Sequence, residues 1–211
     1  MMKLDKKDRI FGYVAMSIVI LGVVVVLILF VGSVVSFFYP QQYVTTDLAD
    51  YGKYVGNYDN KSANKFITSF FPDEISDDFQ NVKYSYRARE GDAYAFEAYL
   101  EFQIEDETAF ESYIAENIGD GATAFEYDPD YKEYVLADAL WLASSDRKGI
   151  SYAKIGKILY SEKEQRIIYV ALAVFDGAGA TADFLCVYFE RFGIDPVAYQ
   201  RGEYEASLAG K

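Results

Sequence analysis

The sequence predicts an α+β protein in which one amino-terminal transmembrane helix precedes a single antiparallel-sheet domain with helices packed on one face. Three observations lead to this prediction. The stretch Ile10–Thr46 contains no Asp, Glu, Lys or Arg. Further along, two pairs of strand-like segments are each joined by a short polar turn, and segments with helical spacing follow both pairs. Within this fold class, a ferredoxin-like arrangement is one candidate.

The uncharged stretch is long and apolar enough to cross a membrane. Its central part, Val14–Val35, would measure roughly 33 Å as a helix, close to the ~30 Å hydrocarbon core of a bilayer. Aromatic residues favour the headgroup level, and they flank this part at Phe11, Tyr13 and residues 37–39. We therefore expect a transmembrane helix over residues 10–39, with the membrane as a partner.

Basic side chains before the span predict its orientation. The head of the chain, residues 1–9, contains four of them: Lys3, Lys6, Lys7 and Arg9. Only Lys53 lies in the first fifteen positions after the span. Positively charged flanks stay on the cytoplasmic side, so we expect a cytoplasmic basic head and a carboxyl-terminal domain outside the cell membrane.

A cleaved signal peptide is the alternative interpretation of this segment. The basic head fits it, and so do the small residues near Val31-Gly32-Ser33 and Val34-Val35-Ser36. However, the apolar core of a signal peptide is only about 7–15 residues long, which is shorter than this span. The length favours an uncleaved single-pass signal-anchor.

The rest of the chain divides into three parts. Residues 40–61 are polar with scattered Tyr and Gly, which predicts a stalk or linker. Residues 62–200 are expected to form one extracytoplasmic α+β domain, beginning with a short helix over 62–71 whose Phe residues mark the start of the core. Residues 201–211 are expected to be a flexible tail.

Two hairpins form the expected sheet. The first joins residues 82–89 to 93–104 through a Glu-Gly-Asp turn, and its strands alternate apolar with polar residues. The second joins residues 150–161 to 166–175. The last of these segments is almost entirely apolar, which predicts a central strand covered on both faces.

Two further helices are expected around these strands. Apolar residues recur at helical spacing at Phe110, Tyr113, Ile114 and Ile118. Asp106 is placed to cap this helix, and the Gly-Asp-Gly at 119–121 to end it. Residues 181–192 have the pattern of a second amphipathic helix. Short strands are expected at 123–127 and 134–137.

Missing residue types restrict the chemistry. The chain has no His and one Cys, Cys186, which excludes Ser-His-Asp triads, Cys-His pairs and the common zinc sites. It also excludes a disulfide within the chain. Cys186 lies in an apolar helical context, where we expect a buried, unreactive thiol. The sequence therefore predicts no catalytic, cofactor-binding or metal-binding residues and no cofactor, and it argues against an enzyme.

Charge restricts the partners. The first nine residues carry four of the 20 basic and two of the 33 acidic side chains, so the remainder has a formal net charge of −15. This disfavours nucleic acid and anionic lipid surfaces as partners, because both attract basic side chains. The charge is suited to cations or a basic partner, although acidity also serves to keep an exported domain soluble.

Tyrosine is enriched, with 20 residues. Such side chains suit surfaces that bind protein or sugar. They also suit half-buried strands. Strand packing is the favoured interpretation because many of them fall in predicted strands: Tyr84, Tyr86, Tyr94, Tyr152, Tyr160 and Tyr169.

Carboxylates are numerous, yet no pair stands out. Two groups lie close in sequence, Glu101 with Glu105 and Glu107, and Glu126 with Asp128 and Asp130. Either could supply the acid and base of a glycosidase.

Other partial motifs are weaker still. The segment 128–133 lacks the Gly and the spaced final Glu of an EF-hand, which leaves at most a looser calcium site there or around Asp176 and Asp183. Residues 60–62 match a glycosylation acceptor, relevant only in a eukaryotic secretory route. The Gly-Ala-Gly-Ala at 177–180 has no following strand to complete a dinucleotide-binding unit.

These observations favour a membrane-anchored protein that presents an acidic, Tyr-rich domain as a non-catalytic binding or accessory module for envelope protein or glycan. An anchored, carboxylate-dependent hydrolase of envelope glycan is one alternative. A structural subunit of a membrane complex, held through its helix, is the other. The sequence leaves the oligomeric state open.

Overall fold

The computed structural model describes residues 6–38, 41–55, 66, 69–90, 94–142, 149–175, 180–181 and 187–201. The chain forms two compact units, Met1–Gln41 and Gln42–Lys211. The first is the helix α1 (Lys6–Phe38), and the second contains the sheet.

Among the described residues, α1 is the one helix that is long and apolar enough to cross a membrane. Its candidate span is Tyr13–Val35. None of this span is buried inside the structure. Its hydroxyl groups bond within the helix, because Ser17 donates to the carbonyl of Tyr13 and Ser33 to that of Leu29, both at 2.9 Å. This internal pairing is what an apolar solvent requires of polar groups. The expected apolar helix is thus present.

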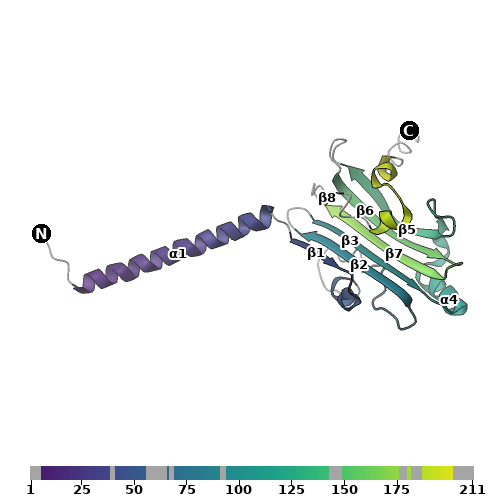
Figure 1. The fold of residues 1–211 in the computed structure, drawn as a ribbon, viewed down its shortest axis with the longest axis horizontal. Helices are drawn as coiled ribbons and strands as arrows, with labels where there is room; N and C mark the ends of the chain where they lie inside the picture. Colours follow the sequence, from purple (N-terminus) through teal and green to yellow (C-terminus); the bar gives the residue numbers. More distant parts are fainter. Residues whose placement is uncertain are drawn as a thin grey trace. The chain divides into compact units, whose positions relative to one another are not determined.

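Eight described strands form one sheet, in the order β1-β2-β3-β7-β6-β5-β4, with β8 paired to β6 (Figure 1). Their bounds are β1 (Gln41–Thr45), β2 (Gln80–Glu90), β3 (Tyr94–Gln103), β4 (Thr123–Ala124), β5 (Lys132–Leu142), β6 (Gly149–Ser161), β7 (Arg166–Phe175) and β8 (Ala180–Thr181). The pairings from β2 across to β4 are all antiparallel, and so is that of β8 with β6. Both predicted hairpins, β2–β3 and β6–β7, are confirmed.

The connection after β3 sets the topology. The chain passes through α4 (Glu107–Asn117) and η2 (Gly119–Gly121) to β4 at the far edge, and then returns strand by strand until β7 lies beside β3. A ferredoxin-like domain would instead run β-α-β-β-α-β, so that candidate arrangement is not observed. Between the hairpins, β5 is one long strand that includes the expected 134–137 segment.

The sheet is buried on both faces. Alternate residues of β7 point to opposite sides, and the eight from Ile167 to Val174 are at most 1% exposed, which confirms the predicted doubly covered strand. The first face packs Phe110 of α4 together with Phe71. The second face packs Tyr188 and Phe189 of α5 (Val187–Phe192).

The expectation that helices cover one face was therefore wrong. A strand that is apolar on both sides needs cover on both sides, and helices supply it on each.

The expected linker also differs from the structure. Residues 42–55 belong to the folded unit, where they form most of β1, then η1 (Leu48–Asp50) and α2 (Tyr51–Tyr54). Tyr51 and Val55 are buried in the core of the first face. The Tyr51 hydroxyl donates to the carbonyl of Pro72 at 2.6 Å. The segment was expected to be a linker because most of its residues are polar, and this composition gave no sign that Tyr51 and Val55 would be buried.

Several expected features lie partly or wholly outside the described residues. Of the expected helix at 62–71, only Phe66 and residues 69–71 are described. The expected helix at 181–192 is observed from Val187 onward, while residue 181 belongs to β8 and 182–186 are not described. The expected tail is not described beyond residue 201.

Candidate functional site

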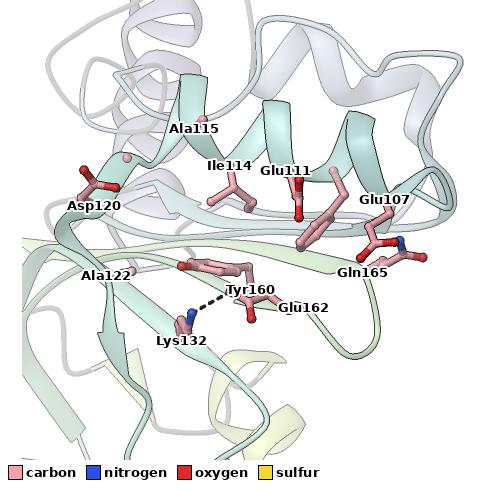
Figure 2. Close-up of a pocket in the computed structure, with 12 residues that line it drawn as sticks. Glu107, Glu111, Ile114, Ala115, Asp120, Ala122, Lys132, Tyr160, Glu162 and Gln165 are labelled. Atoms are coloured by element: carbon pink, nitrogen blue, oxygen red, sulfur yellow. Dashed lines mark hydrogen bonds and ion pairs between the residues drawn. The ribbon is translucent and has the colours of Figure 1, made fainter.

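A groove of about 520 Å³ runs between α4 and the end of the β6–β7 hairpin (Figure 2). Helix α4 contributes one row of side chains, at the spacing of a single helix face: Glu107, Phe110, Glu111, Ile114 and Ala115. The opposite wall comes from β5 and β6 through Lys132 and Tyr160, which are direct cross-strand partners. Figure 2 shows Glu111 and Ile114 extending from the helix toward these strands.

Local sequence fixes the helix that forms this wall. The Asp106 side chain accepts a hydrogen bond from the Ala109 N–H at 2.7 Å, which is the predicted N-cap. After Ile118 the chain turns through Gly119, whose φ of +69° suits glycine. Phe110 is buried and lies 6.5 Å from Tyr160, ring centroid to ring centroid. The same helix face therefore both anchors the helix and lines the groove.

The groove is acidic above an apolar floor. Its walls carry four carboxylates and one cation: Glu107, Glu111, Asp120, Glu162 and Lys132. The Lys132 ammonium pairs with Glu162 at 2.6 Å and lies 5.6 Å from the ring centroid of Tyr160. The hydrogen bond to Glu162 raises the pKa of Lys132, and so does the nearby Tyr160. The cation is thus already neutralised, and the other three carboxylates form no ion pair with any described cation.

This arrangement favours one class of ligand. Phe110, Ile114 and Tyr160 supply apolar surface, and carboxylates above them accept hydrogen bonds from cationic groups. Among the described residues, no group of three or more Asp, Glu, His or Cys side chains is placed to hold a metal ion. The geometry therefore suits a segment that is both apolar and positively charged.

A second charged cluster surrounds Glu101, which is 2% exposed. Its carboxylate accepts from the Tyr99 hydroxyl at 2.7 Å and pairs with Lys83 at 3.2 Å and Arg166 at 3.1 Å. Arg191 of α5 lies 3.6 Å away. Burial alone would raise the pKa of Glu101, but the hydrogen bonds from Tyr99 and Lys83 and the nearby cations lower it. This carboxylate connects β2, β3, β7 and α5 and is held ionised.

The carboxylates that are neighbours in sequence do not form one site. Glu101 is buried on the second face, Glu105 is exposed, and Glu107 lines the groove on the first face. A glycosidase-like pair is therefore not assembled from this group.

The other acidic group is used in a turn and an ion pair. The Asp128 carboxylate accepts from the Asp130 N–H at 3.0 Å, and the Asp130 carboxylate pairs with Lys163 at 2.6 Å. Glu126 lines a different pocket. The other partial motifs lie outside the described residues, wholly or in part: Asp176, Asp183, Cys186, residues 60–62 and residues 177–179.

Most of the singled-out tyrosines are structural. Tyr84, Tyr86, Tyr160 and Tyr169 are at most 6% exposed, as strand packing predicts. Tyr152 is 38% exposed, and the Tyr94 side chain lies outside the described residues.

Sequence reasoning missed most of the groove: Glu111, Asp120, Lys132 and Glu162. A partial signal was present, because Glu107 and Glu111 stand four residues apart beside the apolar row of α4. The residues of the opposite wall, on β5 and β6, show no comparable pattern in the sequence.

Comparison of the chain with protein-family models, with curated proteins and with solved structures finds no match. The function is therefore argued from the geometry.

Proposed function

We propose that this protein is a single-pass membrane-anchored binding module. Its amino terminus lies in the cytoplasm, and its acidic domain lies outside and holds a positively charged segment of an envelope protein in the α4 groove. The observation that carries this proposal is a set of three carboxylates, Glu107, Glu111 and Asp120, which line the groove beside its apolar residues and form no ion pair with a cation among the described residues.

Charge and shape act together in this proposal. Long basic side chains pack their aliphatic stems on apolar surface and keep their charged ends near acceptors. In the groove, Phe110, Ile114 and Tyr160 would contact the stems, while the carboxylates receive the charged ends. The net charge of −15 outside the first nine residues would attract such a partner from a distance and speed its association.

The structure offers less support for the alternatives. Nothing in the groove distinguishes one carboxylate as a general acid and another as a general base. The Glu101 carboxylate is already paired with Lys83 and Arg166. A hydrolase of envelope glycan therefore has no observation in its favour. A role as a structural subunit rests on α1, which offers an unburied apolar surface to another helix.

The test compares two charge reversals on one helix in the full-length protein, held in lipid nanodiscs. The probe is a fluorescent amphipathic peptide of Lys and Leu, and binding is followed by anisotropy. Glu111→Lys is expected to weaken binding about tenfold or more, about 1.4 kcal/mol, because it places a cation in the groove. Glu116→Lys is the matched control, since Glu116 is exposed on α4 outside the groove lining.

The outcomes separate the proposals. Loss only in Glu111→Lys supports the groove, and raising the salt concentration should weaken binding to the native protein. Equal loss in both variants would mean that overall charge alone attracts the peptide. Binding unchanged in Glu111→Lys would sink the proposal, leaving glycan or a helix partner to be tested.

A further inference from the structure

The second face of the sheet holds a buried lysine inside an acidic pocket. Lys157 of β6 is 3% exposed and lies between the core residues Ile155 and Leu159 on the same face. Beside it is a pocket of about 540 Å³. The pocket is lined by four carboxylates, those of Glu126, Glu133, Asp138 and Asp195, and by the rings of Tyr127 and Tyr199.

The lysine ammonium has three short contacts. Its Nζ lies 2.6 Å from an Asp138 oxygen, 3.1 Å from a Glu133 oxygen and 2.9 Å from the Tyr199 hydroxyl. The Tyr199 hydroxyl in turn donates to the Asp138 carboxylate. The contact with Glu133 is an ion pair only, because Glu133 Oε2 has no hydrogen-bond partner among the described residues. The cluster therefore leaves a carboxylate acceptor open at the pocket that Glu133 lines.

A strand irregularity places both acids on this face. In the β5–β6 register Glu133 is opposite Leu159 and Val135 is opposite Lys157. The register then shifts between Val135 and Ala137, so that Asp138 is opposite Ile155. Without this bulge, strand alternation would turn Asp138 to the other face. The two carboxylates consequently flank Lys157 on either side.

The cluster is costly as a purely structural element. Apolar residues of similar size often stabilise a protein as well as a buried ion pair does, or better. The surrounding core is already rich in apolar and aromatic side chains such as Ile194 and Phe189.

A second observation marks the same place. Glu133 lines the pocket, and its Oε2 atom is buried with no hydrogen-bond partner among the described residues. Buried polar atoms are nearly always hydrogen-bonded, so this open acceptor indicates a polar cluster that a bound donor completes.

We propose that this pocket binds a linear aliphatic amine with two or more ammonium groups. Four carboxylates face one lysine, leaving three negative charges for such a ligand. The Tyr127 and Tyr199 rings with Ile194 offer surface for the methylene chain and for cation–π contact. The Lys157 ammonium, held by two carboxylates and a tyrosine, already shows this recognition within the chain. The site is independent of the α4 groove, because it lies on the opposite face of the sheet.

The test is titration calorimetry of the full-length protein in detergent with spermidine as the probe. The double variant Glu126→Gln, Asp195→Asn is expected to weaken binding at least tenfold. Asp195 accepts from the Val197 N–H at 2.8 Å, and Asn keeps an acceptor there, so the fold is retained. The neutral diol 1,4-butanediol is expected not to bind.

A matched double variant assigns the site. Glu111→Gln with Asp120→Asn removes the same charge from the α4 groove and should leave spermidine affinity within twofold. If that variant loses affinity instead, spermidine occupies the groove and the inference is overturned. No heat of binding at millimolar spermidine, or equal affinity in all three proteins, would also overturn it. Neither result bears on whether a basic peptide binds the groove.

Discussion

Glu101 and Lys157 are two buried charges on the second face of the sheet, and each has its partners close by. Three cations and a tyrosine surround Glu101, whereas two carboxylates and a tyrosine surround Lys157. Removing one member of such a cluster leaves a buried charge without its partner, and this lowers the stability of the fold. Replacing the whole cluster by apolar residues would lower it less. Substitution of either buried charge is therefore expected to lower the free energy of unfolding by a large, measurable amount.

Glu101→Gln is expected to lower the free energy of unfolding by about 3 kcal/mol at pH 7. The folded-state pKa of Glu101 lies below its ordinary value of 4.5, so the ionised carboxylate stabilises the fold. That contribution is full above pH 4.5 and disappears as the pH falls through the lower folded-state pKa. The gap between the native protein and Glu101→Gln should therefore narrow below about pH 4.5.

Thermal unfolding followed by near-ultraviolet circular dichroism, in detergent at a series of pH values, measures this gap. The exposed Glu105→Gln, four residues further along the chain, is the control and should change the unfolding temperature little. A gap that stays constant down to pH 3 would contradict the assignment of the stabilisation to the Glu101 carboxylate.

Residues of this kind could be predicted only in part. Strand alternation places Glu101 on the same face as Tyr99, so its inward position is implied by the sequence. Its ion-pair partners come from β2, β7 and α5, and no local pattern connects these segments. The sequence grouped it with Glu105 and Glu107, which are close in the chain and not part of its cluster.

Among the elements, α4 follows most directly from its own residues. Its N-cap, its apolar row and the glycine after it all interact with residues one or two helical turns away. The local sequence is therefore enough to predict where this helix begins and ends. Strand β5 is the opposite case. Its length and the bulge after Val135 depend on pairing with β6, and the sequence predicted only a short strand there. One wall of the groove, α4, could therefore be predicted from the sequence. The other wall, formed by β5 and β6, could not.

Asp106→Ala is expected to destabilise the protein by about 1 kcal/mol, because the Ala109 N–H loses its acceptor. Hydrogen exchange should quicken at the first turn of α4, and peptide binding to the groove should weaken with it. Asp106→Asn keeps a side-chain acceptor and should restore most of the stability. If Ala and Asn behaved alike, the cap would not be what holds this end of the helix.

At the scale of the whole molecule, composition predicted one boundary and missed another. The apolar span was evident because about twenty uncharged residues in a row have few other uses. The start of the folded unit was placed too late, since Tyr51 and Val55 anchor a polar segment through contacts with distant residues. Sheet order likewise depends on the pairing of β3 with β7, whose residues are about 70 positions apart.

The orientation of the chain in a membrane is the prediction that decides whether the groove and the pocket face outside. In a bacterial cell, a reporter active only outside the cytoplasm should be active when fused after Lys211 and inactive when fused before Met1. Replacing the basic side chains of the head by Gln should give a mixed population, because the charge difference across the span then disappears. Protease added to intact cells should degrade the domain only where it lies outside. A cytoplasmic carboxyl terminus in the native chain would contradict the proposed function, while leaving the calorimetric test of the Lys157 pocket intact.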